Sequence, residues 1–218
     1  MNISLQPENY VLLGPPGSGK STQANRLKET LGLAHIDVGS ELRTLAESDT
    51  DLGRRIHEVI NIKKELVSDG LIGKVAEHVL SQISEEKGVL IDGAPRRVSQ
   101  IDEVEEALKL YQREIRYVIF LDLSLEEAVR RISNRFLCLQ CKAPIIKVDE
   151  TPEICSLCGG RVGQRQDDTE EGVTKRYEVF MAETRPVIDF FEKKGKLIRI
   201  DASLAPESIS EALIEKLK

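Results

Sequence analysis

Several features are scarce or missing in this 218-residue chain, and each absence excludes a class of protein. No stretch approaches the roughly 18 uninterrupted apolar residues of a membrane-spanning helix, so we do not expect an integral membrane protein. The first ten residues, MNISLQPENY, lack the basic and apolar regions of a secretory signal peptide, and we therefore expect a cytoplasmic location.

Tryptophan is absent, and no long run of lysine and arginine occurs. The 31 basic residues are outnumbered by 37 acidic ones, which gives a net charge of −6. Because sequence-independent binding to nucleic acid works by neutralising phosphates, this balance disfavours a nucleic-acid partner. With 40% apolar and 31% charged residues, the composition predicts a folded protein of one or two domains.

The chain has four cysteines, and all lie in one segment with the spacing Cys138-x2-Cys141-x13-Cys155-x2-Cys158. Paired C-x-x-C knuckles in a reducing compartment favour one tetrahedral Zn²⁺ held by four thiolates. Two redox dithiols, or a disulfide, are the alternatives. With four protein ligands the zinc has no open position for water, so we expect a structural metal.

Strand and helix patterns alternate along the chain. Short apolar runs predict strands at 10–13, 33–36, 88–91, 117–121 and 197–200. Helices are predicted at 20–31, in pieces over 40–60, at 69–83, at 170–184 with a continuation past Pro186 to near Gly195, and at 207–217. A further helix opens with the capping box Ser124-x-x-Glu127. The fold class predicted is α/β with a parallel sheet, interrupted by the cysteine segment at about 136–163.

The strongest chemical signal is the motif GPPGSGKS at 14–21, which fits the phosphate-loop pattern G-x-x-x-x-G-K-[ST]. It lies between a predicted strand and a predicted helix, which disfavours a chance glycine-rich turn. Backbone N–H groups and the helix N-terminus attract phosphate, the lysine bridges the β- and γ-phosphates, and a hydroxyl serves Mg²⁺ or phosphate. The residues predicted to bind a nucleoside triphosphate are Gly17, Ser18, Gly19, Lys20, Ser21 and Thr22.

Arginines at the ends of strands and around the cysteine segment suit a site that holds two sets of phosphates. They are Arg43, Arg96, Arg131, Arg135, Arg165 and Arg176. Arg54, Arg55 and Arg113 are expected to be merely solvated. Asp92 ends a predicted strand and is suited to holding Mg²⁺ through water.

Taken together, these motifs resemble the adenylate kinase family, nucleoside monophosphate kinases of the long type with a zinc-bearing lid. The matching stretches are GPPGSGKSTQ, HIDVGSELR (35–43), ELVSD (65–69), IDGAPRRVSQ (91–100), RRISNR (130–135), the four cysteines, QRQDDTEEGVTKR (164–176) and KKGKLIRID (193–201). They follow the family order over essentially the whole chain.

The resemblance implies a P-loop NTPase-type core with a five-stranded parallel sheet, formed by residues 1–36, 67–133 and 172–218. It also implies a monophosphate-binding helical insertion at 37–66 and a zinc lid at 134–171 that closes over the triphosphate. The implied acceptor-site residues are Val38, Gly39, Arg43, Val67, Gly93, Arg96, Gln100, Arg165 and Arg176. Arg135 is implied for ATP, whereas Arg131, Arg165 and Arg176 are implied for the transferring phosphates and Asp167 and Asp168 for holding the closed lid.

The activity implied is transfer of the γ-phosphoryl of Mg·ATP to AMP, giving two ADP, by a monomer that uses structural Zn²⁺ and ATP-associated Mg²⁺. His35, His57 and His78 show no catalytic arrangement. The chain departs from the family pattern at Val38, Ser40, Ala94 and Asn134, where Thr, Asp, Phe and Gly are usual. A kinase for CMP, UMP or GMP therefore stays open, as does a non-catalytic phosphate-loop or zinc-ribbon binding protein. The guanine-recognition quartet N-K-x-D is absent, which disfavours a GTPase switch.

Overall fold

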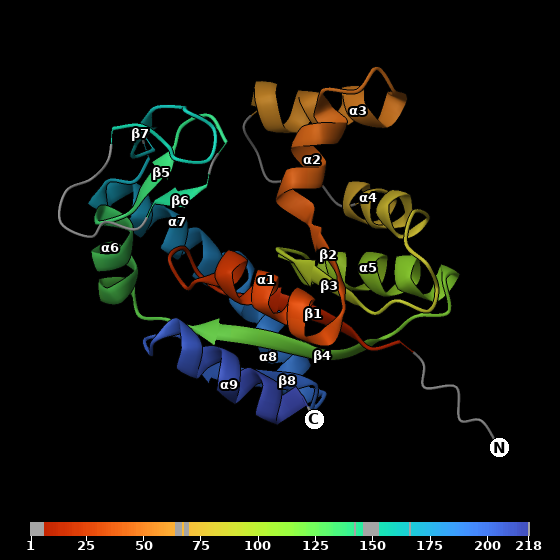
Figure 1. The fold of residues 1–218 in the computed structure, drawn as a ribbon. Coiled ribbons are helices and arrows are strands. Elements are labelled where there is room, and N and C mark those ends of the chain that lie inside the picture. The colour runs from red at the N-terminus through yellow and green to blue at the C-terminus, as the bar shows by residue number, and fades with distance from the viewer. Residues whose placement is uncertain are drawn as a thin grey trace.

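The computed structural model describes residues 7–63, 67, 70–141, 143–145, 153–165 and 167–217. Its centre is a five-stranded parallel sheet in the order β2-β3-β1-β4-β8 (Figure 1). The strands are β1 (Asn9–Leu13), β2 (Ala34–Asp37), β3 (Val89–Asp92), β4 (Ile115–Asp122) and β8 (Leu197–Asp201). This arrangement confirms the predicted fold class.

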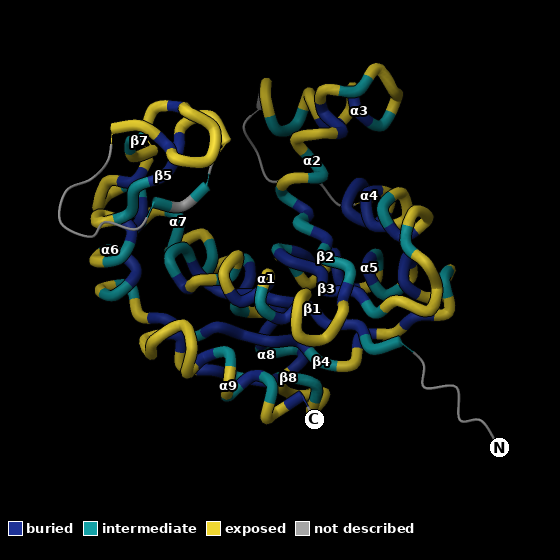
Figure 2. The backbone as a smooth tube through the Cα atoms, viewed as in Figure 1, coloured by how far each residue is buried: buried dark blue, intermediate teal, exposed yellow. Residues whose placement is uncertain are grey.

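Helices cover both faces of the sheet, which explains why the strands are apolar on both sides. On one face lie α4 (Leu71–Leu80), α5 (Ser99–Leu110) and α8 (Arg185–Lys193). The other face is covered mainly by α1 (Lys20–Leu31) and α9 (Pro206–Leu217), with contributions from α6 (Leu125–Ser133) and α7 (Glu170–Glu183). All five residues of β1 are buried, as the dark centre of Figure 2 shows.

Two smaller units stand apart from each other on one side of the sheet (Figure 1). The first contains α2 (Val38–Ala46), α3 (Asp51–His57) and the π-helix η1 (Glu58–Lys63), and α2 and α3 pack around the buried Ile56. The second contains an antiparallel sheet in the order β6-β5-β7. Its strands are β5 (Phe136–Cys138), β6 (Pro144–Ile145) and β7 (Val162–Gly163).

Several local predictions are confirmed. Each predicted strand is found with ends shifted by at most two residues, and α1 has the bounds predicted for it. The Ser124 hydroxyl caps α6 by accepting from the Glu127 amide at 3.3 Å. The Glu127 carboxylate, however, binds Arg130 and Arg131, so only one half of the capping box forms as the motif suggests.

Other features differ from the sequence-based expectation. Helix α5 was not predicted, although Ile101, Val104 and Leu108 follow helical spacing and are all buried. The helix predicted to continue through Pro186 instead breaks at Thr184, so that proline lies in the first turn of α8, where it costs no hydrogen bond.

The prediction that Arg113 is merely solvated is wrong, because its side chain is buried. Its guanidinium donates to Asn9 Oδ1 at 3.1 Å, to the Lys87 carbonyl at 2.6 Å and to the Ser84 carbonyl at 2.7 Å. It thereby joins the loop before β3 to the starts of β1 and β4, and this contact depends on tertiary structure. Arg54, in contrast, is exposed and pairs with Asp49 and Asp51.

None of the helices in the described part of the chain has both the length and the apolar character needed to cross a membrane.

Candidate active site

The phosphate loop connects β1 to α1. Gly17 and Gly19 have φ values of 78° and 83°, in the left-handed region that favours glycine. Gly19 is the N-cap of α1 and offers no side chain to its amides. The first N–H groups of α1 are therefore available to an anion, and the helix dipole adds positive potential there.

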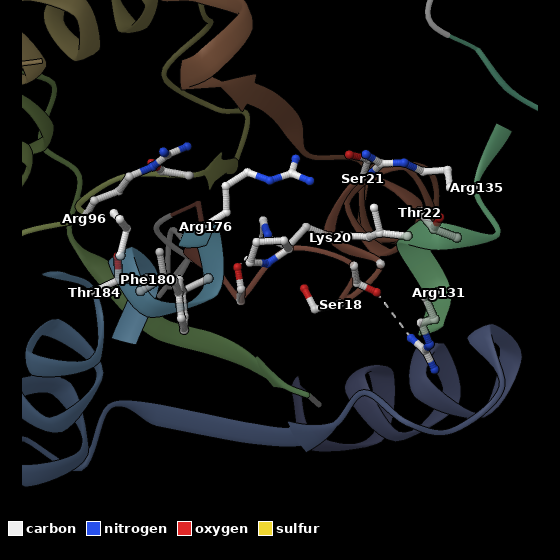
Figure 3. A pocket seen from close by; sticks show the side chains of 18 of the residues that line it. Ser18, Lys20, Ser21, Thr22, Arg96, Arg131, Arg135, Arg176, Phe180 and Thr184 are labelled. Atoms are coloured by element: carbon white, nitrogen blue, oxygen red, sulfur yellow. Dashed lines mark hydrogen bonds between the residues drawn. The ribbon is translucent and has the colours of Figure 1, made fainter. Parts of the chain in front are cut away.

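A cavity of about 900 Å³ opens in front of this loop (Figure 3). Its volume lies within the range of small-molecule sites. The predicted residues that line it are Gly17, Ser18, Gly19, Lys20, Ser21, Thr22, Gly93, Arg96, Arg131, Arg135, Arg165 and Arg176. The structure thus brings five arginines, from four segments distant in sequence, to one cavity around Lys20.

Lys20 is folded back over the loop. Its ammonium donates to the Gly14 carbonyl at 2.6 Å and to the Pro15 carbonyl at 3.1 Å. Burial lowers the pKa of Lys20 to about 8; Asp92 and Asp37 raise it, and Arg96 lowers it. An anionic ligand bound next to Lys20 would therefore stabilise the charged form of this lysine.

Two arginines share one buried carboxylate on the side of the cavity nearest the cysteine segment. Arg135 binds Asp168 through Nε at 3.1 Å and through Nη2 at 2.7 Å, and Arg176 Nη2 lies 3.0 Å from the same carboxylate. The Asp168 side chain is fully buried, whereas the two arginines are about one-third exposed. Arg176 also pairs with Asp167 at 3.1 Å. Asp168 fixes both guanidinium groups while leaving them open to the cavity.

Arg131 lies beside a second cavity of about 440 Å³, bounded by the phosphate loop and by 203–206. Its Nε donates to Glu127 at 2.6 Å and its Nη2 donates to the Ser203 carbonyl at 3.1 Å. Hydrogen bonds from Arg130 and then Arg131 lower the pKa of Glu127 to about 2, so this carboxylate stays ionised.

Arg96 marks the other end of the main cavity, next to α5. Its Nε donates to the Gly93 carbonyl at 2.8 Å, and its backbone amide donates to the buried Gln100 side chain at 2.9 Å. Burial is the main reason that the pKa of Arg96 is lowered, and nearby Arg43 lowers it further. Gln100 also donates to the Val67 carbonyl at 3.3 Å, so the Arg96 turn and Val67 are held together.

Asp92 lies at the carboxyl end of β3 and is 7% exposed. The sheet register sets Asp92 opposite Leu12 of β1, two residues before the phosphate loop begins. His35 Nε2 lies 3.4 Å from Asp92 Oδ2. A carboxylate at this position can receive a hydrated divalent cation, which prefers oxygen ligands.

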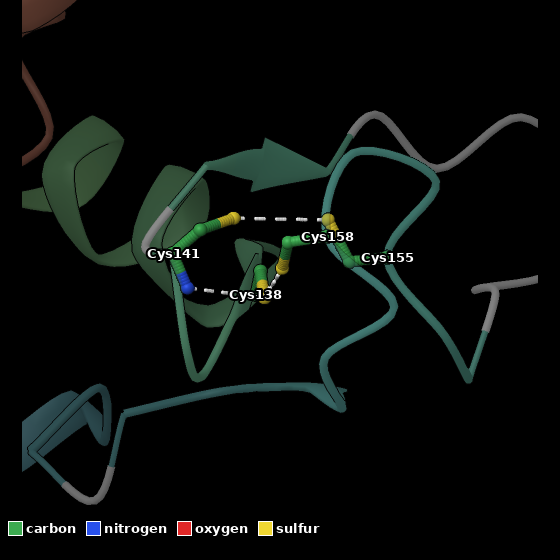
Figure 4. A group of neighbouring side chains, drawn as sticks. All are labelled: Cys138, Cys141, Cys155 and Cys158. Atoms are coloured by element: carbon green, nitrogen blue, oxygen red, sulfur yellow. Dashed lines mark hydrogen bonds between the residues drawn. The ribbon is translucent and has the colours of Figure 1, made fainter.

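The four cysteines form a second cluster, in the unit built from β5, β6 and β7 (Figure 4). All four are free thiols, and their sulfur atoms lie within 4.8 Å of one another. The sulfur atoms of Cys138 and Cys158 are 3.5 Å apart, and those of Cys141 and Cys155 are 3.8 Å apart. Tetrahedral zinc with Zn–S bonds of about 2.3 Å requires sulfur separations of about 3.8 Å, so this cluster could hold a metal ion. Hydrogen bonding from the Cys141 amide is the main reason that the pKa of Cys138 is lowered to about 6.

Comparison with known proteins agrees with this geometry. The sequence model of a family described as "Adenylate kinase" matches residues 12–196. The chain belongs to the adenylate kinase family. It is 38% identical over 213 residues to an adenylate kinase of Thermosipho melanesiensis, a match that covers 96% of this chain and 99% of that protein. An adenylate kinase of Archaeoglobus fulgidus is 38% identical over 216 residues, again with 96% and 99% covered.

The remaining predicted residues lie outside the lining of the main cavity. They are Val38, Gly39, Arg43, Val67, Asp92 and Gln100. Val38 and Ala94, two of the departures from the family pattern, are buried in the apolar cluster that also contains Val67. Ser40 is exposed; its amide donates to the Asp37 side chain, which caps α2.

Sequence analysis missed several residues at this site. Lys175, Phe180, Glu183 and Thr184 line the main cavity. Phe180 and Thr184 follow Arg176 at intervals of four residues, so the helical spacing of α7 could have placed them on the same face. The 203–206 stretch carried no signal of its own, because it depends on how the turn after β8 meets the phosphate loop.

Proposed function

We propose that this protein is an adenylate kinase, which reversibly transfers the γ-phosphoryl group of Mg·ATP to AMP and forms two ADP. The observation that carries the proposal is the position of five arginines and Lys20 around one cavity at a phosphate loop. Such a concentration of positive charge exceeds what one triphosphate needs and suits a donor and an acceptor bound together.

The donor would bind with its phosphates on the loop formed by 17–22. The backbone amides of the loop and Lys20 bind the phosphates, and Arg135 reaches them from the far side. The loop residues Gly17 and Thr22 also line the cavity beside Arg131 and 203–206, and this cavity offers space for the adenine of ATP. A guanidinium group stacks favourably on a base, and this is the contact we assign to Arg131.

Magnesium enters with ATP. The oxygen donors present suit this hard cation: the hydroxyl of Ser21 or Thr22 would bind it directly, and Asp92 would bind it through water. When bound, the ion neutralises charge on the phosphates.

The acceptor would bind at the Arg96 end, between the core and the unit that contains α2. Arg43 and Arg96 bind its phosphate, and the backbone of Val67 with Gly39, Gly93 and Gln100 borders the nucleoside. Val38 contributes an apolar wall rather than a hydroxyl. We therefore expect AMP to be the best acceptor, with a narrower margin over other bases than a hydroxyl at position 38 would give.

Catalysis would come from positioning and charge. The acceptor phosphate is already anionic at neutral pH, so no general base is needed to activate it. Lys20, Arg165 and Arg176 are placed to neutralise the equatorial oxygens of the transferred group. The resemblance implies the same role for Arg131, but Glu127 and the Ser203 carbonyl hold it beside the second cavity, so we assign it to the adenine instead. Closure of the lid over both nucleotides would exclude water and limit hydrolysis of ATP.

We assign residues 1–36, 67–133 and 172–218 to the core, 37–66 to the acceptor-binding domain and 134–171 to the lid. In the lid, Cys138, Cys141, Cys155 and Cys158 would hold one structural Zn²⁺. The sulfur separations of 3.5 and 3.8 Å support this choice, because thiolates at tetrahedral spacing suit zinc. Since the short sheet joins the two knuckles, zinc would add a second link between them and stabilise the lid rather than take part in transfer.

An acceptor panel tests the proposal. Purified protein with Mg·ATP is given AMP, CMP, UMP or GMP, and kcat/KM is measured for each. We expect AMP to be preferred and two ADP to appear for each ATP consumed. Preference for another monophosphate would refute the assignment of AMP while leaving the phosphotransfer chemistry in place. Light scattering in the same buffer tests our expectation that the protein is a monomer.

A further inference from the structure

Helix α4 begins without a capping side chain of its own. Its N-cap residue is Gly70, with φ 87° and ψ −14°, and no side-chain hydrogen bond caps the helix from that position. The first amides of a helix have no partner within the helix, and this end carries partial positive charge. An acceptor from elsewhere in the fold would therefore stabilise the start of α4.

Glu103 in α5 supplies that acceptor. The Gly70 amide donates to Glu103 Oε1 at 2.6 Å, and the Gly73 amide donates to Glu103 Oε2 at 3.1 Å. One carboxylate thus takes two of the amides that the helix leaves free. A Cβ atom at position 73 would lie 3.3 Å from Glu103 Cβ and 3.4 Å from the Glu103 carbonyl oxygen, so glycine there allows the two helices to approach closely.

Gln100 lies one turn before Glu103 on the same helix and makes a related link. Its Oε1 accepts from the amides of Arg96 at 2.9 Å and Arg97 at 3.3 Å, and its Nε2 donates to the Val67 carbonyl. Residues three apart share a helix face, so one side of α5 holds the Arg96 turn, Val67 and the start of α4.

We propose that Glu103 is a positioning residue for the acceptor nucleotide. By capping α4 it fixes Gly70, three residues after Val67 in the sequence, and Gln100 on the same helix sets the Val67 carbonyl relative to Arg96. It makes no contact with substrate. The inference rests on the proposed function, because Val67 and Arg96 are assigned there to the acceptor site.

The first test is Glu103→Gln, which keeps the size of the side chain but removes its charge and one acceptor oxygen. Loss of one capping interaction shifts the equilibrium between the ordered and frayed start of α4 about fivefold. Since the proposal makes AMP binding depend on the ordered form, we expect KM for AMP to rise about fivefold. The KM for ATP and kcat should stay within roughly twofold, because the donor site and the reacting groups are untouched. Amide hydrogen exchange at Gly70 and Gly73 should become faster.

Two further variants make the test specific. Gly73→Ala presses on the same contact from the other helix and should raise KM for AMP in the same way; it carries the test if Glu103→Gln does not fold. Glu106→Gln makes the same chemical change at an exposed position of α5 and should leave both KM values unchanged.

Faster exchange and lower stability in Glu103→Gln with an unchanged KM for AMP would show a purely structural cap and would overturn the inference. An equal rise in both KM values would overturn it as well. Wild-type protein that does not phosphorylate AMP would instead refute the proposed function, and this inference with it.

Discussion

Because Lys20 loses its charge as the pH rises through about 8, we expect kcat/KM for Mg·ATP to fall above that pH. Burial lowers the pKa of this ammonium from its ordinary 10.5 to about 8 in the nucleotide-free protein. The pH dependence of kcat/KM reports the pKa of groups in the free enzyme. With a pKa of about 8, roughly nine-tenths of the molecules carry the charge at pH 7 and about one-tenth at pH 9. We therefore expect kcat/KM for Mg·ATP, measured at AMP concentrations well below its KM and at constant ionic strength, to fall about tenfold over these two pH units.

Lys20→Arg is the matched control, because a guanidinium stays charged throughout this range. The variant should be less active than wild type at pH 7, since its shape does not match the loop, but its profile should be flat from pH 7 to pH 9. A flat wild-type profile, or a parallel fall in both proteins, would refute the assigned pKa.

The same pKa shift affects stability with a defined sign. Between pH 8 and 10.5 the unfolded chain holds a proton that folded Lys20 has lost, so the free energy of unfolding of wild type rises with pH in this window. Lys20→Met lacks this dependence. It should be more stable than wild type below pH 8 by roughly 3 kcal/mol, and the difference should vanish near pH 10.5.

Four further predictions follow from the site. Arg96→Ala should lower kcat by about 10²- to 10⁴-fold with its circular dichroism unchanged, and near wild-type turnover would contradict its role. Asp168→Asn should lower the free energy of unfolding by about 2 kcal/mol in urea titration, because it leaves two arginines without their shared carboxylate; an unchanged midpoint would count against that contact. Metal analysis should find about one zinc per chain. Removal of the zinc should lower the melting temperature of the lid while kcat changes little. A kcat that follows zinc occupancy while the stability of the lid stays constant would contradict a structural role. Val38→Thr with Ala94→Phe should widen the kcat/KM margin of AMP over CMP, UMP and GMP by about tenfold, and an unaltered margin would refute the role given to these two positions.

Features encoded locally could be predicted from the sequence. The phosphate loop was found because glycine, lysine and serine occur at fixed spacing between a strand and a helix. The strands were found because both faces of a parallel sheet are apolar, so each strand appears as a short apolar run. The cysteine pairs were found because two residues separate the cysteines within each knuckle.

Features that depend on tertiary structure could not be predicted. The burial of Arg113 results from the loop before β3 and the starts of β1 and β4 meeting at one end of the sheet, and no local sequence pattern indicates that they meet. The sequence around Glu103 gives no sign that this residue caps another helix, because the contact requires α4 to start at Gly70 beside α5. The second cavity likewise arises from the approach of 203–206 to the phosphate loop.

The most direct test of the central claim follows the transferred group itself. ATP labelled in its γ-phosphoryl group is incubated with Mg²⁺, AMP and the purified protein, and the products are separated after a single turnover. We predict that the label appears in the β-phosphoryl group of ADP formed from AMP and that formation of this ADP depends on AMP. Label recovered mainly as inorganic phosphate, or consumption of ATP at the same rate without AMP, would contradict the account.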